Sequence, residues 1–461
     1  MPSVAPGTVV NLDFWVPFGQ TPLAATEAKA AEFSQIIQRE TGVTVNVNVS
    51  YQGSYDDIRS KILQGFATAN VPTLAVAYPD HVASYLGSSR DYVYDMTPYF
   101  DDPTVGFGTQ SYLGDSEEYD EEDIIAAYFE EGTRYTIEGT FSYPLMKSSE
   151  VMFYNADAVE LIMAALPDTF LPNASRATPQ AFLDDLSWED LIEVARFAKQ
   201  NKSRILDTLE EPIWYDSDSN LFISKMYQNK IDFTSIDANG SGVIAFESGE
   251  ARSKTEAMVN ALASAAQEGI ITTKGVKDTY GSDSFSNGKC IFEIGSSGGA
   301  GYTAPSGAAF NYSVTMVPAS NENPLYISQG PDVAFIRNPG LSQEENDLRV
   351  YYAWQFVKFL TNPSSNVYLC VYGSEGYVPI RYSAYESAAY QQFLAEGESI
   401  AETARVLSNK INGRFLNTDI FVGSAELRDQ VGGVLTQVFK GLKDTKTAID
   451  DAISYTKTFI K

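Results

Sequence analysis

The first eighty residues alternate apolar segments with amphipathic ones, and this order constrains the fold more than any other feature of the chain. Residues 9–15 (VVNLDFW) predict a buried strand, and residues 23–41 predict a helix that follows a Pro/Gly loop. Residues 43–51 alternate with the period of a strand, residues 58–66 carry a helical apolar face, and residues 73–78 (TLAVAY) read as a third strand. Strand, helix, strand, helix and strand in close order predict a parallel α/β sheet.

Polar and aromatic residues follow each of these strands. They are Phe18-Gly19-Gln20, Tyr51 and Pro79-Asp80-His81. Ligands of open α/β sheets bind outside the carboxyl ends of the strands. We therefore expect these segments to line a ligand cleft.

The rest of the chain continues the α/β pattern. Residues 101–123 form an acidic stretch that we expect to be a solvated face or loop, with calcium capture as the lesser alternative. Residues 140–159 predict two apolar strands interrupted at Lys147-Ser148-Ser149. Ser187 and Ser342 predict capped helix starts, and residues 425–461 predict two amphipathic helices. No internal repeat or low-complexity linker separates these parts, which favours two α/β lobes joined by strands.

Size and charge narrow the function classes. A chain of 461 residues is too long for one ordinary core. The net charge of −28 argues against nucleic acid or anionic lipid as partners, although a local basic pocket is compatible with it. No apolar run approaches the roughly 18 residues of a spanning helix, and the first residues show no signal peptide. A flexible start followed at once by a strand is compatible with a mature exported domain.

The few cysteines and histidines exclude most metal and acid–base chemistry. Cys290 and Cys370 lie in apolar contexts and are expected to be buried free thiols, with one disulfide as the alternative. His81 is the only histidine, which removes most zinc sites and most histidine-based catalysis.

Two short motifs resemble a catalytic site and a metal site but lack residues that those sites require. GSSGG at residues 295–299 matches a nucleophile elbow, but that order requires a histidine after the serine, and His81 precedes it. A loop that offers backbone donors to a ligand fits this segment better. DSDSN at residues 216–220 lacks the glycine and glutamate of a calcium loop and predicts either Asx-type turns or a polar stretch lining a cleft.

Three later segments resemble the extracytoplasmic solute-binding proteins of ABC importers, in the carbohydrate-binding family. YYAWQFVKFLTNPSSNVYLCVYGSEGYVPIRYSAY is similar to the helix, "FLTSPE", helix, "GYLPV" and "SAY" signature of that family. SSEVMFYNADAV is similar to the segment where the chain first crosses between lobes, and FSNGKCIFEIGSSG resembles a family strand and its following loop. The resemblance covers nearly the whole chain.

Within that family the likeness is strongest to receptors for glycerol-3-phosphate and glycerophosphodiesters. The features that carry it are the Tyr51–Tyr55 turn (YQGSY), Ser148 and Ser149, Ser296 and Ser297, Gly330, Tyr377 and Arg428. The chain departs from those receptors at Pro79, where they have a glutamate beside the tyrosine, with Asp80 only nearby. This departure leaves open whether the ligand is a phosphate ester.

The residues themselves suit a sugar, which offers apolar faces and a rim of hydroxyls. Tyr51, Tyr377 and Trp214 could pack on sugar faces, or they could be ordinary core and surface residues. Asp80 and Ser149 could pair hydroxyls, and His81 could pair with Asp80. Arg428 could bind a phosphate or carboxylate, or form an ordinary surface ion pair.

The resemblance and the residues together imply a two-lobe α/β receptor with a hinge between the lobes. The expected lobes are residues 1–144 plus 328–385, and residues 145–327 plus 386–461. The expected ligand-binding residues are Tyr51, Tyr55, Asp80, Ser149, Trp214, Asp218, Ser297, Gly330, Tyr377 and Arg428.

The expected function is to capture a carbohydrate by hinge closure and to deliver it to an ABC permease in the membrane. A receptor for glycerol-3-phosphate or a glycerophosphodiester is the alternative. A carboxylate-based carbohydrate-active enzyme is a second alternative, and an adhesin or scaffolding protein is a third. We expect no cofactor, no metal and no nucleic acid, a monomer, and an extracytoplasmic location with a lipid anchor.

Overall fold

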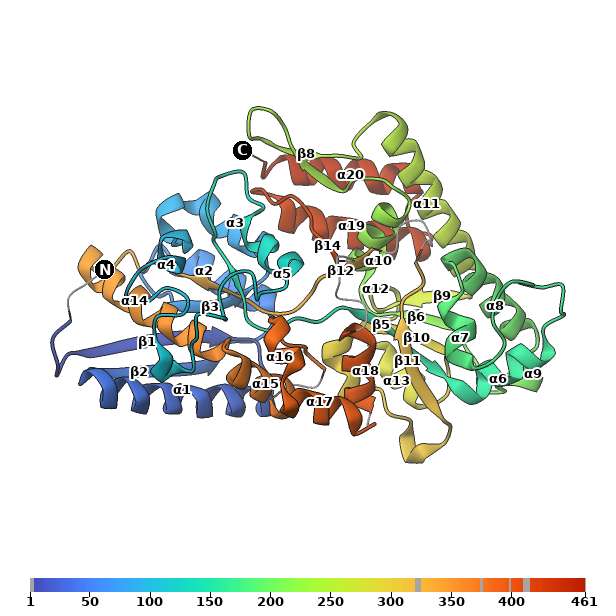
Figure 1. Ribbon diagram of the computed structural model, residues 1–461. Helices are drawn as coiled ribbons and strands as arrows, with labels where there is room; N and C mark the ends of the chain where they lie inside the picture. The colour runs from blue at the N-terminus through green and yellow to red at the C-terminus, as the bar shows by residue number, and fades with distance from the viewer. Residues whose placement is uncertain (1–3, 320–324, 374–375, 398, 409–414, 461) are drawn as a thin grey trace.

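The protein folds into two lobes, each built around one β-sheet with helices packed against it (Figure 1). The computed structural model describes residues 4–319, 325–373, 376–397, 399–408 and 415–460. The two-lobe α/β fold expected from the sequence is confirmed. The exact boundaries of the lobes stay a prediction.

The first lobe contains a five-stranded sheet in the order β2-β1-β3-β13-β4. Its elements are β1 (Val9–Val16), α1 (Gln20–Thr41), β2 (Thr44–Tyr51), α2 (Tyr55–Gly65), β3 (Leu74–Ala77), α3 (Pro79–Ser88), α4 (Thr97–Phe100), α5 (Ala126–Glu130), β4 (Tyr143–Pro144), β13 (Asp332–Phe335), α14 (Gln343–Leu360) and α15 (Pro363–Tyr372). Strand β1 pairs in parallel with β2 and with β3, as predicted, whereas β13 is antiparallel to β3 and β4.

Aromatic packing joins the sheet of the first lobe to its covering helices. Phe33 of α1 packs against Phe356 of α14 with ring centroids 5.2 Å apart, and Phe14 of β1 meets the same ring edge-on at 6.1 Å. Such pairs contribute about 0.5–1.5 kcal/mol each beyond the burial of their area. This core fixes β1 and β3, and therefore the loops at their carboxyl ends.

The second lobe contains a five-stranded sheet in the order β11-β5-β10-β6-β9. Its elements are β5 (Glu150–Asn155), α6 (Ala156–Ala165), α7 (Pro179–Asp184), α8 (Trp188–Gln200), α9 (Lys202–Ile205), β6 (Ile213–Tyr215), α10 (Asp218–Gln228), β7 (Thr234–Ile236), β8 (Gly242–Ile244), α11 (Gly249–Gln267), β9 (Ile271–Thr273), α12 (Lys274–Lys277), α13 (Gly281–Ser286), β10 (Phe292–Ser296), β11 (Tyr312–Met316), α19 (Ser424–Phe439) and α20 (Thr445–Lys457). Strands β10, β6 and β9 run in parallel, and β5 is antiparallel to β10 and β11.

The remaining elements are β12 (Tyr326–Ile327), α16 (Tyr382–Glu386), α17 (Ala388–Ala395), α18 (Ser399–Ser408) and β14 (Phe415–Leu416). Strands β12 and β14 pair in parallel. The predicted capping boxes of α8 and α14 are both present, and so are the two predicted C-terminal helices, α19 and α20.

Three chain segments lie side by side where the lobes join. The backbone of Lys147 exchanges hydrogen bonds of 3.0 and 2.7 Å with Val378, and Ser148 exchanges two of 2.9 Å with Gln329. Gly330 has φ +103°, and a Cβ there would lie 2.8 Å from the carbonyl oxygen of Met146. The closeness of these segments therefore requires glycine at this position.

A buried ion triad lies directly beneath this junction. The Lys147 ammonium lies 2.5 Å from Asp332 and 2.6 Å from Glu131, and the side chain of Ser142 donates to Asp332 at 2.8 Å. The side chains of Lys147 and Asp332 are 1% and 0% exposed. The triad ties β13 and the loop after α5 to the first crossing segment.

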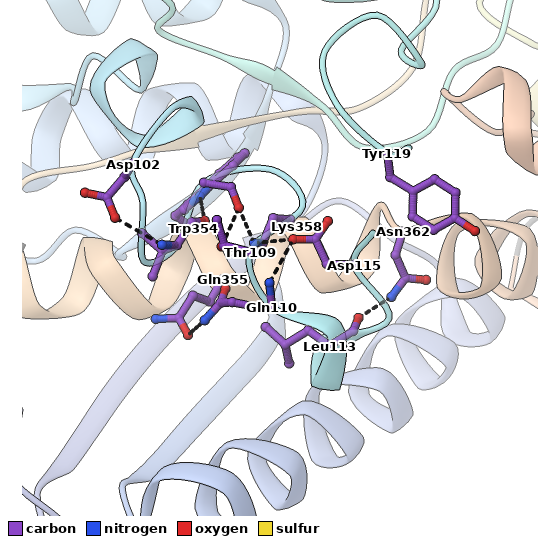
Figure 2. A network of polar contacts seen from close by, with 12 residues as sticks. Asp102, Thr109, Gln110, Leu113, Asp115, Tyr119, Trp354, Gln355, Lys358 and Asn362 are labelled. Carbon is purple, nitrogen blue, oxygen red and sulfur yellow. Dashed lines mark hydrogen bonds and ion pairs between the residues drawn. The ribbon is translucent and has the colours of Figure 1, made fainter. Parts of the chain in front are cut away.

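The acidic stretch at residues 101–123 differs from the solvated loop that we predicted (Figure 2). Asp115 is buried and pairs with Lys358 of α14 at 2.7 Å, and the same ammonium donates to the carbonyl of Gly106 at 2.7 Å. Trp354 donates to the carbonyl of Val105 at 2.8 Å. The expectation of a wholly solvated stretch was wrong for Asp115, because a buried lysine from a distant helix compensates its charge.

Cys290 and Cys370 are buried free thiols, as expected. Among the helices of the described residues, none has both the length and the apolar character needed to cross a membrane.

Candidate functional site

A cavity of about 230 Å³ lies between the two lobes, and we call it the main cavity. The first lobe, the second lobe and the junction between them all contribute to its wall. Its lining residues are Asp56, Tyr78, Pro79, Asp80, His81, Glu131, Ser217, Ser219, Asn220, Ile327, Ser328, Gln329, Gly330, Leu416, Thr418, Ile420, Arg428 and Asp429. Of the predicted ligand residues, the structure brings Asp80, Gly330 and Arg428 together here.

The starts of two helices place polar groups in this wall. Helix α3 begins with Pro79 directly after β3, because proline suits the first helical position, and Asp80 follows in the first turn. Helix α10 begins after β6, and the side chain of Ser217 caps it by accepting from the backbone N–H of Asn220. Both helices start at the carboxyl ends of strands, where a ligand site is expected.

Arg428 connects the two lobes inside the cavity. Its Nε donates to Asp80 of the first lobe at 2.9 Å, and its Nη1 donates to Asn220 of the second lobe at 2.9 Å. The sequence left open whether this side chain faces the cleft or solvent. The structure places it in the cavity wall, where it forms an ion pair across the interface between the lobes.

The charges around Arg428 shift the pKa values of their neighbours. Burial raises the pKa of the Asp80 carboxyl, but the Arg428 guanidinium outweighs this effect and holds that pKa below its usual value. Burial and the charge of Asp56 raise the pKa of Asp429 to about 6. Burial lowers the pKa of His81, which therefore favours its neutral form.

A second set of ion pairs joins α2 to α19 beside the cavity. Arg59 pairs with Glu426 and lies 3.7 Å from Asp429. His81 lies 3.4 Å from Asp56. The structure pairs His81 with Asp56, whereas the Oδ2 atom of Asp80 accepts from Arg428.

A second cavity, of about 320 Å³, has an aromatic wall, and we call it the aromatic cavity. Tyr55, Tyr377, Phe18, Tyr302 and Gly298 are among its lining residues. Tyr55 also stacks on Tyr78 of the main cavity with ring centroids 4.1 Å apart and planes 7° from parallel. The stacked pair therefore touches both cavities, one ring on each side.

The other predicted residues lie away from the two cavities. Tyr51 is 58% exposed at the end of β2, and Trp214 is buried in β6 against Gly281 of α13. Asp218 is occupied by Thr273, Gly275 and Thr436, which donate to it at 2.6, 3.0 and 2.9 Å.

The two predicted serines belong to the junction. Ser149 is buried and donates to the carbonyl of Ile327 at 2.8 Å. Its own carbonyl accepts from the backbone N–H of Ser297 at 2.8 Å, and the hydroxyl of Ser297 is buried with no hydrogen-bond partner among the described residues.

Several lining residues were not predicted as ligand residues. Asn220 lies in the DSDSN segment, Gln329 directly precedes Gly330, and Asp429 directly follows Arg428. Glu131 begins a short helical turn, and no local sequence pattern predicts that it lines a cavity.

Below the wall, Glu150 is a buried carboxyl that accepts a hydrogen bond from Tyr215. Burial raises the pKa of Glu150 to about 8, although hydrogen bonds from Tyr215 and Asn220 act in the opposite direction. Asn220 therefore links this carboxyl to Arg428.

Exchanging Glu150 for glutamine should change the pH dependence of stability. A folded-state pKa near 8, against an ordinary value of 4.5, stabilises the folded protein below pH 4.5, and this contribution is lost as the pH rises through 8. Each pKa unit corresponds to about 1.4 kcal/mol. The free energy of unfolding of Glu150→Gln, relative to that of the wild type, should therefore rise by several kcal/mol from pH 5 to pH 9. Urea unfolding at pH 5, 7 and 9 measures this difference. The exposed Glu250→Gln is the control, and a difference that does not vary with pH would contradict the prediction.

The family to which the chain belongs follows from its sequence. The family described as bacterial extracellular solute-binding protein matches residues 30–395. The chain belongs to this family. The expected resemblance to extracytoplasmic solute-binding proteins is confirmed, and the extracellular family places the protein outside the cytoplasm. No curated protein sequence matches the chain significantly.

Solved structures share the two-lobe fold at low sequence identity. The GacH receptor of Streptomyces glaucescens, solved with acarbose, is 15% identical with a TM-score of 0.66, and 98% of each chain is covered. UgpB from Mycobacterium tuberculosis, solved with glycerophosphocholine, is 18% identical with a TM-score of 0.67 over 97% of this chain and 98% of the other. Maltose-bound MalE3 of T. maritima is 14% identical with a TM-score of 0.66 over 98% and 100%. This solute-binding protein therefore has the fold of maltose-binding proteins.

Proposed function

We propose that this solute-binding protein is the receptor of an ABC importer that captures a carbohydrate in the main cavity and delivers it to a membrane permease. The observation that carries the proposal is the composition of the cavity wall. Asp80 comes from the first lobe, Asn220 and Arg428 come from the second, and Gln329 comes from the junction. A ligand held by these groups touches both lobes at once.

Binding would act by favouring the closed arrangement of the lobes. A ligand shifts a conformational equilibrium only by its different affinities for the two states. In an open state the groups of one lobe would lose the ligand, so contacts from both sides stabilise closure. No bond is made or broken in this process.

The polar and aromatic groups around the cleft suit a sugar. Asp80, Asn220 and Gln329 can pair hydroxyls, and the stacked Tyr55 and Tyr78 offer apolar faces beside them. Of the residues expected from the sequence, we propose Asp80, Gly330 and Arg428 as contacts in the main cavity and Tyr55 and Tyr377 as contacts in the aromatic cavity. Two of the structural neighbours were solved with acarbose and with maltose.

A phosphate ester of a polyol is the second candidate ligand. A guanidinium suits phosphate, and Arg428 lies in the cavity wall. One structural neighbour was solved with glycerophosphocholine.

A ligand screen by thermal shift tests the proposal. We expect a rise in Tm with a member of a panel of neutral oligosaccharides, because ligand binding to the folded state stabilises it by mass action. Small-angle scattering with the same ligand should show a smaller radius of gyration. A carbohydrate-active enzyme would instead release products from the panel, and failure of any small ligand to compact the protein would favour a scaffolding role.

The delivery step adds two further expectations. We propose that the protein is a monomer tethered to the membrane surface by a lipid anchor. Light scattering after size-exclusion chromatography measures the first, and mass spectrometry of the protein from its native membrane measures the second.

A further inference from the structure

The positive charge of Arg428 is already compensated in the cavity wall. Asp80 accepts from its Nε at 2.9 Å, and Asn220 accepts from its Nη1 at 2.9 Å. A guanidinium has five N–H donors, so about three remain for other partners. What remains at Arg428 is a set of hydrogen-bond donors, because the carboxylate of Asp80 balances its charge.

The rest of the wall adds negative charge. Asp56, Glu131 and Asp429 line the main cavity together with Asp80, and Arg428 is the only lysine or arginine among the described residues that line it. Lys147 and Arg59 pair with Glu131 and Asp429 from behind the wall, but each of these cations is shared with a second carboxylate, Asp332 or Glu426. The helix N-termini that face the cleft do not reverse this balance, because α3 and α10 carry Asp80 and Asp218 in their first turns. An anion entering this cavity meets carboxylates on several sides.

Unpaired acceptors point to the kind of ligand that fits. The Oδ1 atom of Asp80 and the Oε1 atom of Gln329 are buried and have no hydrogen-bond partner among the described residues. Asp80 is itself only 8% exposed. A buried acceptor without a partner is destabilising, so a ligand that supplies donors to these atoms gains affinity. Hydroxyl groups supply such donors, and an ionised phosphate or carboxylate does not.

We propose that Asp80 is the residue that determines specificity, and that the main cavity selects an uncharged polyhydroxyl ligand and rejects ligands that carry an ionised phosphate or carboxylate group. In this arrangement Asp80 accepts from a ligand hydroxyl through Oδ1 and neutralises Arg428 through Oδ2. The remaining N–H groups of Arg428 donate to hydroxyl oxygens of the same ligand. The proposal rests on the proposed function and narrows its ligand class.

Asp80→Asn tests the proposal, because it removes the charge while keeping the size of the side chain. Asp168→Asn is the control, since it removes the same charge from an exposed turn outside the main cavity. Calorimetry at pH 8 would measure the affinity of the wild type and both variants for neutral malto-oligosaccharides, for their phosphorylated forms and for glycerol-3-phosphate. Inorganic phosphate serves as a probe that does not depend on the identity of the sugar.

We expect the wild type to bind a neutral sugar roughly 100-fold more tightly than its phosphorylated form. Asp80→Asn should reduce that ratio about 10-fold or more and should gain affinity for inorganic phosphate, whereas Asp168→Asn should change the ratio by less than about 3-fold. Equal or tighter binding of phosphate esters by the wild type would overturn the proposal and leave the receptor function intact. Equal effects of the two variants would also overturn it, because net charge alone would then explain the selectivity. Binding of neither class would overturn the proposed function together with this inference.

Discussion

Replacing Lys147 with methionine should lower the free energy of unfolding by about 3–5 kcal/mol, which is typical for the removal of one partner from a buried ion pair. Asp332 and Glu131 would lose the ammonium that lies 2.5 and 2.6 Å from them. Burial raises the pKa of Glu131, and the Lys147 ammonium acts in the opposite direction, so its removal would leave two buried carboxyls without a counter-charge. Chemical denaturation at pH 7 measures the loss.

An exposed lysine provides the matched control for this prediction. Lys446 lies 2.6 Å from Asp450 and its side chain is 72% exposed. Lys446→Met should cost far less stability than Lys147→Met, because surface ion pairs contribute little. If both variants lose the same stability, burial of the triad is not what makes Lys147 important. Adding Asp332→Asn to Lys147→Met should restore part of the loss.

Gly376→Ala should weaken ligand binding about 100-fold by holding the lobes apart. Gly376 has φ +140°, and a Cβ there would lie 1.8 Å from the carbonyl oxygen of Ser297 in the second lobe. An L-residue at such a φ costs about 1–3 kcal/mol, and the overlap adds to this cost. Since a hinge can relieve the overlap by opening, we expect the closed state to lose population while each lobe stays folded. Calorimetry with the best sugar from the ligand screen measures the affinity, and the thermal transition checks folding.

Gly249→Ala separates backbone strain from overlap. Gly249 also has a positive φ, +68°, but a Cβ there would have nothing within 4 Å. This variant should leave ligand affinity unchanged. If Gly376→Ala behaves like Gly249→Ala, the contact with Ser297 does not control closure.

Local patterns predicted most of the fold. Each of the successful predictions rests on a signal within a few residues. These signals are the period of residues 43–51, the capping pairs that begin at Ser187 and Ser342, and the apolar strand before Pro79. The structure contains the corresponding elements. Such signals are readable because propensity, capping and periodicity are properties of short segments.

The ion pairs between distant parts of the chain could not be predicted in the same way. Asp80 and Arg428 are 348 positions apart, and Lys358 and Asp115 are 243 apart, so no local pattern joins either pair. Asp218 shows that a local pattern can also suggest the wrong role. It follows a strand, as a ligand residue would, but its carboxylate holds α12 and α19 in place.

The position of β13 has a consequence for the order in which the protein can form during synthesis. This strand lies between β3 and β4, yet it begins at Asp332, and β4 ends at Pro144. Ribosomes add about 5–20 residues per second, so roughly 10–40 seconds pass before β4 has a partner strand. During that time the nascent first lobe has an unfilled edge at β3, whereas every strand of the second sheet has already been made. The second sheet can therefore be completed before the first, although the chain begins in the first lobe.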